Sequence, residues 1–374
     1  MNTVVVRAIS ADEHRTFLQG HGRASFLQTP AWAAVKSDWR GESIGWVEGG
    51  RLRGAALVLY RRLPRLRPSF AYLPEGPVID WASDDLAAQL AGLAAHAKGQ
   101  GAFAVRIGPP VACRIWEART VKKSLAQAGV RHLRQVEPDL HPAAGRRVRE
   151  VLRSAGWQPS PDCEGFGMGQ PQHVFQVPLA GRSEQDVLAG MNQMWRRNIA
   201  RAAREGVRVS TGTRSDLSDF HRVYVETAER DHFTPRPTSY FQRMYDALDA
   251  DDASAITLYL AHHEDDLVAA ALGVQVGDHV WYSYGASTTR KREVRASHAI
   301  QWRMLRDALA AGAAVYDLRG ITGTLNEDDP HVGLTRFKVG TGGRVVEYVG
   351  EWTLPISRPL TSVFNLYLRR RAGA

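Results

Sequence analysis

The segment Trp46–Val58, WVEGGRLRGAALV, returns in altered form as Leu260–Leu272, LAHHEDDLVAAAL. In each segment, apolar residues flank a short turn of glycines or acidic residues, a pattern that predicts two strands joined as a hairpin. The second strands share their apolar positions at a constant offset: Leu52, Ala55, Ala56 and Leu57 correspond to Leu267, Ala270, Ala271 and Leu272. The two segments therefore predict an internal duplication.

Each hairpin is followed by a helical pattern and then by an apolar strand. Apolar residues recur at three- and four-residue spacing over Asp85–Gly99 and again over His298–Ala311. The predicted strands Ala102–Ile107 and Ala314–Leu318 come next. Two α/β units of similar plan are the simplest interpretation. The alternative is a chance match, because strand, turn, strand, helix and strand often follow one another in this order.

The composition indicates a globular protein with a basic surface. Of the 374 residues, 44% are hydrophobic and 23% are charged, and the net charge is +9. This charge suits an anionic partner, such as nucleic acid, a phosphorylated substrate or an acidic membrane face. No apolar run approaches the roughly 18 residues that span a bilayer, and the N-terminal residues lack the apolar core of a secretory signal. We therefore expect a cytoplasmic protein.

The sequence predicts neither a disulfide framework nor a metal site. The two cysteines, Cys113 and Cys163, are too few for either a framework of disulfides or a cysteine zinc site. The histidines are scattered, and no metal-binding spacing of His, Glu or Cys occurs. We expect neither a metal nor an organic cofactor.

Further helical patterns occupy the middle and the end of the chain. The ranges 147–156, 183–206, 215–230 and 355–371 are predicted helices, and 344–352 is a predicted strand. The second of these helices carries a basic stretch that includes Arg196, Arg197 and Arg201. Such a stretch contacts phosphates of a partner or forms the solvated face of a helix.

Four segments combine polar, aromatic, Gly and Pro residues in a way that a plain core does not require. They are Phe26–Lys36, Tyr72–Asp80, Phe233–Phe241 and Arg336–Gly340. Taken one at a time, Lys36 is interpreted as a solvated helix residue, Asp80 as a turn residue and Phe337 as a core aromatic. Their order and spacing along the chain favour a functional interpretation.

Together these segments resemble the FemABX family, the aminoacyl-tRNA-dependent transferases that add amino acids to peptidoglycan precursors. The resemblance extends over nearly the whole chain. Its pieces are Gln28, Trp32 and Lys36; Gly76–Asp80; Arg197–Ala202 with Glu205–Val207; Phe233, Arg236, Pro237, Tyr240 and Phe241; Tyr284–Ser287; Tyr316–Gly320; and Phe337–Lys338.

The resemblance implies an α/β (α+β) fold of two tandem domains, each similar to the GNAT acetyltransferases. The first domain would comprise residues 1–160 and be completed by residues 350–374, and the second would comprise residues 161–349. Some members of the family carry a coiled-coil arm in the second domain. This chain has no heptad run there, and we expect no arm.

The resemblance also implies roles for three residues at the reacting centre. Lys338 and Phe337 would meet the acceptor end of the tRNA and the reacting carbonyl, and the Lys338 ammonium would stabilise the tetrahedral oxyanion. Phe337 would position Lys338 through a cation–π contact or stack on the terminal adenine. Asp80 would orient or deprotonate the attacking amine.

A second set of residues would hold the substrates. Lys36 and Arg236 match the residues with which the family grips the precursor's phosphates. Tyr240, Tyr72 and Tyr284 complete the predicted precursor site. Lys338, Phe337, Arg196, Arg197 and Arg201 are the predicted tRNA contacts. The acceptor would be lipid II or UDP-MurNAc-pentapeptide, and the transferred residue glycine, alanine or serine, with glycine the first expectation.

Three other functions remain open at this point. An acyl-CoA-dependent N-acyltransferase would share the fold, but Arg295 and Ser297 stand where its pyrophosphate loop needs glycines. The other two are tRNA-dependent transfer to a peptide antibiotic and non-catalytic binding of tRNA or precursor. A basic cluster, Arg61, Arg62, Arg65 and Arg67, would suit contact with an anionic inner membrane leaflet.

Overall fold

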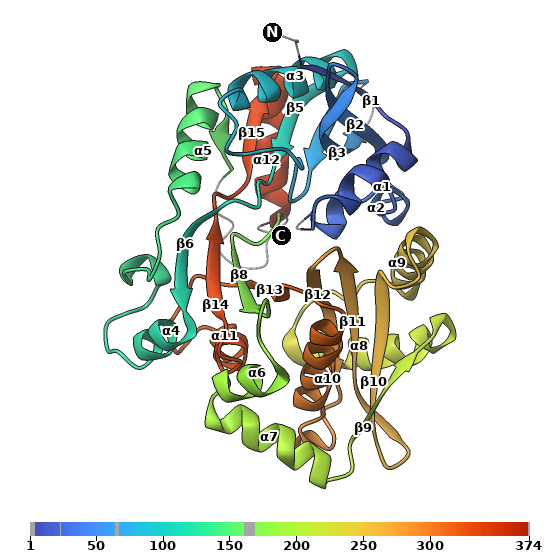
Figure 1. Cartoon of the computed structure of the whole chain (residues 1–374), viewed down its shortest axis with the longest axis vertical. Helices are drawn as coiled ribbons and strands as arrows, with labels where there is room; N and C mark the ends of the chain where they lie inside the picture. Colours follow the sequence, from blue (N-terminus) through green and yellow to red (C-terminus); the bar gives the residue numbers. More distant parts are fainter. Residues whose placement is uncertain (1–3, 23, 64–66, 161–168, 373–374) are drawn as a thin grey trace.

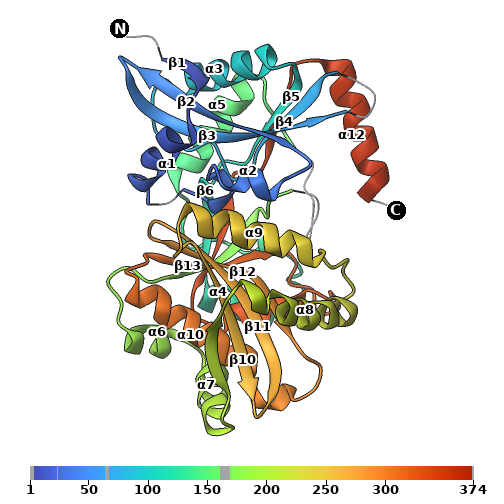
Figure 2. The ribbon, with the colours of Figure 1, turned by 90° about the vertical axis from the view of Figure 1, so that its right-hand side faces the viewer.

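The computed structural model describes residues 4–22, 24–63, 67–160 and 169–372, with side chains given up to residue 366. Two β-sheets with helices on their faces form two units, one above the other in Figure 1. The longest helices of the described residues have 15 residues, and no coiled-coil arm protrudes in Figures 1 and 2. None of the described helices is both long and apolar enough to cross a bilayer.

The first sheet has seven strands in the order β1-β2-β3-β4-β5-β15-β7. These are β1 (Val5–Ala8), β2 (Arg40–Glu48), β3 (Arg51–Arg62), β4 (Ser69–Leu73), β5 (Ala102–Ile107), β7 (Gln158–Pro159) and β15 (Trp352–Pro355). The second sheet has eight strands in the order β6-β14-β8-β13-β12-β11-β10-β9. These are β6 (Ala112–Glu117), β8 (His173–Pro178), β9 (Arg208–Gly212), β10 (Ile256–His263), β11 (Asp266–Val276), β12 (His279–Ser287), β13 (Val315–Ile321) and β14 (Arg344–Tyr348).

The predicted duplication is confirmed by the pairing of the strands. The β2–β3 and β10–β11 hairpins are both antiparallel, and each is followed by a third antiparallel strand. In the first unit, helix α3 (Leu86–Gly99) connects β4 to the parallel strand β5. In the second, α10 (Ala296–Ala310) connects β12 to the parallel strand β13. The same plan therefore occurs twice, as the two sequence segments predict.

The chain crosses between the sheets more often than the predicted boundaries imply. Those boundaries assign residues 112–125 to the first unit, but β6 pairs with β14 and helix α4 (Ala118–Leu125) packs beside it in the second. The single strand predicted over 344–352 is two strands in different sheets, because β14 pairs with β6 and β8 whereas β15 pairs with β5 and β7. Tyr348 and Trp352 thus lie in neighbouring sheets.

The helix predicted over 183–206 is two helices, α6 (Glu184–Gly190) and α7 (Gln193–Arg204). Met191 is extended, with ψ of 149°. The Asn192 side chain then caps α7 by accepting the Trp195 N–H. The other helices are α1 (Ala11–Gln19), α2 (Trp32–Val35), α5 (Ala143–Ser154), α8 (Leu217–Asp231), α9 (Thr238–Asp251), α11 (Val332–Val339) and α12 (Arg358–Ala372).

An apolar core joins the two units. Phe26 and Trp32 of the first unit pack with Phe220, Phe241 and Trp281 of the second. Figure 2 shows α9 lying directly below α2 at this junction. Burying large aromatic side chains between the units is strongly favourable, so their relative position is well defined.

Candidate active site

Lys36 and Arg236 lie close together although they are far apart in the sequence. Lys36 directly follows α2, and its ammonium lies 5.6 Å from the centre of the Trp32 ring. Burial, together with the positive charge of nearby Arg236, lowers the pKa of Lys36 to about 8. A bound anion would reverse this shift by favouring the charged ammonium. The pair is therefore suited to holding a phosphate group.

Aromatic residues hold Arg236 in place. The Arg236 guanidinium lies 4.5 Å from the centre of the Tyr240 ring, and the Tyr284 hydroxyl donates to the Tyr240 hydroxyl at 3.1 Å. Tyr224 packs edge-on against Tyr284, with ring centroids 6.2 Å apart. Four predicted site residues, Lys36, Arg236, Tyr240 and Tyr284, thus belong to one cluster at the junction of the two units.

Lys338 is buried in α11, with an exposed fraction of 4%. Its Nζ donates to the Gly320 carbonyl of β13 at 2.6 Å. Burial lowers the pKa of Lys338 to about 7, while the charge of Asp317 raises it and that of Arg319 lowers it. Its charge therefore changes near neutral pH, unlike that of an exposed lysine.

A bulge in β13 brings the Gly320 carbonyl to Lys338. The pairing of β13 with β8 shifts register between Asp317 and Gly320, and Arg319 is left-handed with φ of 63°. The Asp317 carboxylate accepts the Arg319 N–H at 2.6 Å, which stabilises the bulge. Left-handed residues other than glycine are strained and concentrate at functional sites.

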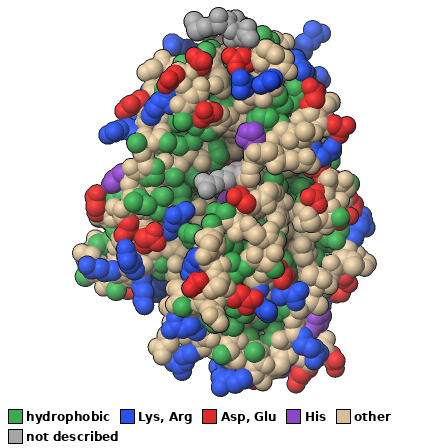
Figure 3. Space-filling view, in the orientation of Figure 1, with side chains coloured by type: hydrophobic (Ala, Val, Ile, Leu, Met, Phe, Trp, Pro, Cys, Tyr) green, Lys and Arg blue, Asp and Glu red, His purple; other side chains and the backbone are tan. Residues whose placement is uncertain are grey.

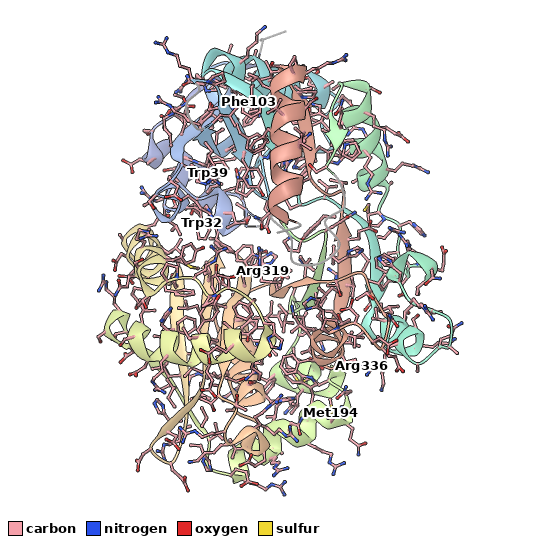
Figure 4. All side chains as sticks on the ribbon, turned by 180° about the vertical axis from the view of Figure 1, so that it is seen from behind. Trp32, Trp39, Phe103, Met194, Arg319 and Arg336 are labelled. Carbon is pink, nitrogen blue, oxygen red and sulfur yellow. The ribbon has the colours of Figure 1, made fainter. Side chains whose placement is uncertain are left out.

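The same bulge directs the Arg319 side chain toward the first unit. Its guanidinium donates to Glu75 Oε1 at 2.8 Å and to Gln170 Oε1 at 3.2 Å. The other Glu75 oxygen accepts the Ser25 hydroxyl at 2.6 Å. Glu75 is also left-handed, with φ of 48°. Figure 4 shows Arg319 in the region between the two units, so the ion pair joins them.

A cavity of about 250 Å³ opens beside this ion pair. Its lining comes from both units and includes Glu75, Trp281, Asp317, Arg319, Arg344 and Tyr348. Side chains of both charges face a small space, which suits a compact polar group that carries an amine and a carbonyl. Lys338 lies next to this lining, since after burial the charges of Asp317 and Arg319 are the groups that act on its pKa.

Tyr72 belongs to the Glu75–Arg319 side of the site and not to the Lys36 cluster. Its hydroxyl donates to Glu351 Oε1 and receives a hydrogen bond from Gln170 Nε2 at 3.4 Å. Burial raises the pKa of Glu351. Gln170 also bonds to Arg319, so Tyr72 is linked to the interdomain ion pair through one side chain.

Asp80 does not join either group of residues. It is exposed, its side chain accepts the Ala82 N–H at 2.9 Å, and its carbonyl accepts the Ser83 N–H. These bonds form a turn ahead of α3. The structure therefore favours the turn interpretation of Asp80 over a role in deprotonating an amine.

Phe337 packs in an aromatic cluster. Its ring centroid lies 4.8 Å from that of Trp195 and 5.2 Å from that of His298. Among the described residues it makes no cation–π contact with Lys338. The ring instead packs against Trp195 of α7. The Trp195 indole also donates to the Phe337 carbonyl at 2.9 Å, so both contacts hold α11 against α7.

The predicted tRNA contacts on α7 differ in their surroundings. Arg196 donates to the carbonyls of Ala189 and Met191 just before its own helix, and Arg201 pairs with Glu205 at 3.4 Å. Arg197 is exposed. In Figure 3, Lys and Arg side chains gather over α7 and α4, with Asp and Glu among them. Of the cluster suggested for membrane contact, Arg65 lies outside the described residues, as does Cys163.

Sequence reasoning missed the residues that build the wall of the cavity. Glu75, Asp317 and Arg319 lie inside segments that the sequence singles out, but the contact between Glu75 and Arg319 spans 244 positions and leaves no local pattern. Glu351 had no sequence signal. No group of three His, Cys, Asp or Glu suited to a metal occurs in the described part of the chain.

Comparison with known proteins identifies the family to which this architecture belongs. The FemAB family model matches residues 9–265 and 255–368, which is nearly the whole chain. The chain belongs to the FemAB family. A similar curated protein, the lipid II:glycine glycyltransferase of Staphylococcus aureus (strain USA300), is 24% identical, over 94% of this chain and 93% of that protein.

Solved structures support the fold of this FemAB family member. The crystal structure of FemX has a TM-score of 0.80 with 22% identity, and the match covers 96% of this chain and 99% of FemX. A tandem GNAT protein from the clavulanic acid biosynthesis pathway has a TM-score of 0.51 with 10% identity, covering 94% and 98%. The two units are therefore tandem GNAT-like domains.

Proposed function

We propose that this protein is an aminoacyltransferase that moves a small amino acid, glycine first, from aminoacyl-tRNA to the stem-peptide amine of a peptidoglycan precursor. The precursor would be lipid II or the UDP-linked pentapeptide. The observation that carries the proposal is the placement of three cationic residues in a member of the FemAB family. Lys36 and Arg236 lie together at one end of the interdomain region, and Lys338 lies at the other end. The name of the Staphylococcus aureus relative supports lipid II as acceptor.

The proposed reaction forms one amide bond and breaks one ester bond. The amine nitrogen attacks the ester carbonyl carbon, and the carbonyl electrons move to oxygen to give a tetrahedral oxyanion. Collapse of this intermediate expels the ribose oxygen, which takes a proton while the nitrogen loses one. Lys338 would exchange its bond to Gly320 for one to the oxyanion, and Lys36 and Arg236 would hold the acceptor's phosphates.

The test is direct incubation of the protein with a mixed pool of charged tRNA and each precursor in turn. Mass spectrometry of the product identifies the amino acid and the acceptor together. Addition of one residue to either precursor, dependent on intact charged tRNA, is the expected result. Absence of product with both acceptors would refute the proposal.

Replacing Arg236 with Ala is expected to raise the KM for the precursor while leaving the affinity for tRNA unchanged. Arg236 and Lys36 share one cationic site, and removing one charge-assisted hydrogen bond to a phosphate costs about 1.5–3 kcal/mol, or about ten- to hundredfold in affinity. Steady-state kinetics with both substrates varied separately measures this. Arg222→Ala is the matched control, because Arg222 is an exposed arginine in the same unit and pairs with Asp219. Equal effects of the two variants would remove Arg236 from the precursor site.

Acyl-CoA is expected not to bind. The loop before α10 carries Arg295 and Ser297, and Arg295 is left-handed with φ of 62°. Side chains at these positions keep the backbone N–H groups away from a pyrophosphate. Calorimetry with acetyl-CoA and longer acyl-CoAs should show no saturable heat. Micromolar binding accompanied by acyl transfer would favour the N-acyltransferase instead.

A further inference from the structure

A cavity of about 580 Å³ lies between α5 and β6 and is lined by four arginines. Arg146, Arg149 and Arg153 follow one face of α5 at three- and four-residue spacing, and Arg114 faces them from β6. The remaining arginine of this part of α5, Arg147, is turned away and bonds to the Trp81 and Ser83 carbonyls. One face of α5 thus lines this cavity.

The local carboxylates do not neutralise the cavity. Glu347 is buried, with an exposed fraction of 1%, and is shared between Arg114 and Arg149. It therefore balances one of four positive charges. Arg153 lies over the Trp352 ring at 5.6 Å. Arg146 is exposed and has no ionic partner among the described residues.

A second cavity, of about 560 Å³, is lined by Asp139 and Leu140, the residues just before the two of the chain segment 139–142 that line the first cavity. Leu140 lines the second cavity and His141 the first. Arg119 and Lys122 of α4 supply its positive charge. Two carboxylates, Glu117 and Asp139, also line this cavity and offset those two charges. Asp139 accepts hydrogen bonds from the Glu117 N–H and the Thr120 hydroxyl. We call these two cavities the arginine trough, defined by Arg114, Arg119, Lys122, Arg146, Arg149 and Arg153.

The trough ends at the helix that carries Lys338. Val339 lines the second cavity, together with Asn192 at the start of α7. Large apolar side chains are exposed at this end: Leu140 is 51% exposed, Met194 of α7 54% and Leu334 of α11 38%. Figure 4 shows Met194 and Arg336 on adjoining helices here. These side chains offer unpaired bases at the end of a nucleic-acid strand an apolar contact, in place of the aromatic stacking found in other single-strand sites.

The trough lies on the opposite side of the molecule from the predicted precursor site. β6 is one edge of the second sheet, whereas β10, near α9 and the Lys36 cluster, lies toward the other edge. Figure 1 shows α4, α5 and β6 along the left side and α2 and α9 on the right. The two cationic sites are therefore separate.

We propose that the arginine trough binds the phosphodiester backbone of RNA, with the unpaired 3′ end directed toward α11. The choice of RNA rests on the proposed function, which needs a second polyanion beside the precursor. Guanidinium groups hold phosphates in a duplex stem without reading its sequence. The apolar end of the trough then receives the unpaired bases.

The test uses a short RNA hairpin with an unpaired 3′ end and no amino acid attached. Its binding is measured by fluorescence anisotropy over a series of salt concentrations. The variant Arg119→Glu, Lys122→Glu, Arg146→Glu changes three exposed residues of the trough. Arg222→Glu, Arg290→Glu, Arg292→Glu is the matched control, because it makes the same change of net charge at exposed sites outside the trough. Thermal unfolding checks that both variants fold.

The trough variant is expected to bind the hairpin at least about tenfold more weakly than the control. Its salt dependence should fall by about one unit for each phosphate that the variant no longer neutralises. Equal weakening in the two variants would show a general effect of charge and overturn the proposal. Binding that neither variant weakens would overturn it as well. A trough variant that keeps its RNA affinity but no longer binds vesicles of anionic phospholipid, which the unaltered protein binds, would overturn the proposal too. That result would assign the trough to a membrane surface.

The outcome is separable from that of the proposed function. A hairpin that binds through the trough in a protein that transfers no amino acid would uphold the trough and refute the transferase. If the protein transfers an amino acid and the trough variant keeps the same KM for tRNA, the transferase is upheld and the trough is refuted. The KM for the precursor is expected to stay the same in both variants.

Discussion

Replacing Lys338 with Ala is expected to lower kcat by about a hundredfold or more, as removal of one oxyanion donor does in other enzymes. The ammonium is buried and, within the described part of the chain, donates its hydrogen bond to the Gly320 carbonyl. Removing it takes away the positive charge that the proposed oxyanion needs, while the precursor should still bind through Lys36 and Arg236. Lys338→Arg should restore little, because a planar guanidinium does not fit a space built for a compact ammonium.

Rate against pH provides an independent reading of the same residue. Because the ammonium form is the one proposed to act, kcat/KM should fall as pH rises through about 7, the pKa of Lys338 in the free protein, with a separate fall near 8 as Lys36 loses its charge. The Asp317 charge raises the pKa of Lys338, so Asp317→Asn should move the first fall to lower pH. Lys338→Met keeps the volume and checks folding, and exposed Lys98→Ala is the control. Normal turnover in folded Lys338→Met would exclude Lys338 from the chemistry.

Replacing Glu75 with Ala is expected to lower the free energy of unfolding by about 3–5 kcal/mol. The pair joins the two units, and the side chains of Arg319 and Glu75 are only 19% and 11% exposed. Removing the carboxylate leaves a nearly buried guanidinium without its counter-charge. Equilibrium unfolding in urea, followed by tryptophan fluorescence, measures the change. The double variant Glu75→Ala, Arg319→Met should recover part of the stability, because no unpaired charge then remains.

An exposed ion pair provides the comparison for this prediction. Arg306 and Glu184 lie 2.9 Å apart with side chains 50% and 49% exposed. Glu184→Ala should therefore cost less than about 1 kcal/mol. A destabilisation of that small size for Glu75→Ala would show that the interdomain pair contributes little, and that the aromatic core around Trp32 alone holds the units together.

The duplicated unit was predictable because its signals are local. A hairpin, a helix and an apolar strand each leave a pattern within about 20 residues, and the two copies reinforce each other. Which sheet a short strand joins has no such signature, and that is why β6 was assigned to the wrong unit and why β14 and β15 were predicted as a single strand. The break between α6 and α7 depends on a single capping side chain, Asn192, in a stretch whose pattern suits one long helix.

The candidate site was predictable where one residue carries its own signal. Lys36, Arg236 and Lys338 come from short motifs, and the first two do lie together. Asp80 shows the limit of this approach, because an acidic residue after Gly and Pro suits a turn as well as a base. Glu75 and Arg319 act only as a pair across two sheets, and no local pattern joins them.

The two sheets share one feature with a consequence for synthesis on the ribosome. β14 lies between β6 and β8, and β15 lies between β5 and β7. Each sheet thus receives an interior strand from residues that follow α11 in the chain. A nascent chain that has emerged only up to α11 has a gap in both sheets, so neither domain can close until residues 344–355 have emerged. Until then β6 and β5 carry unpaired edges that invite pairing with other nascent chains.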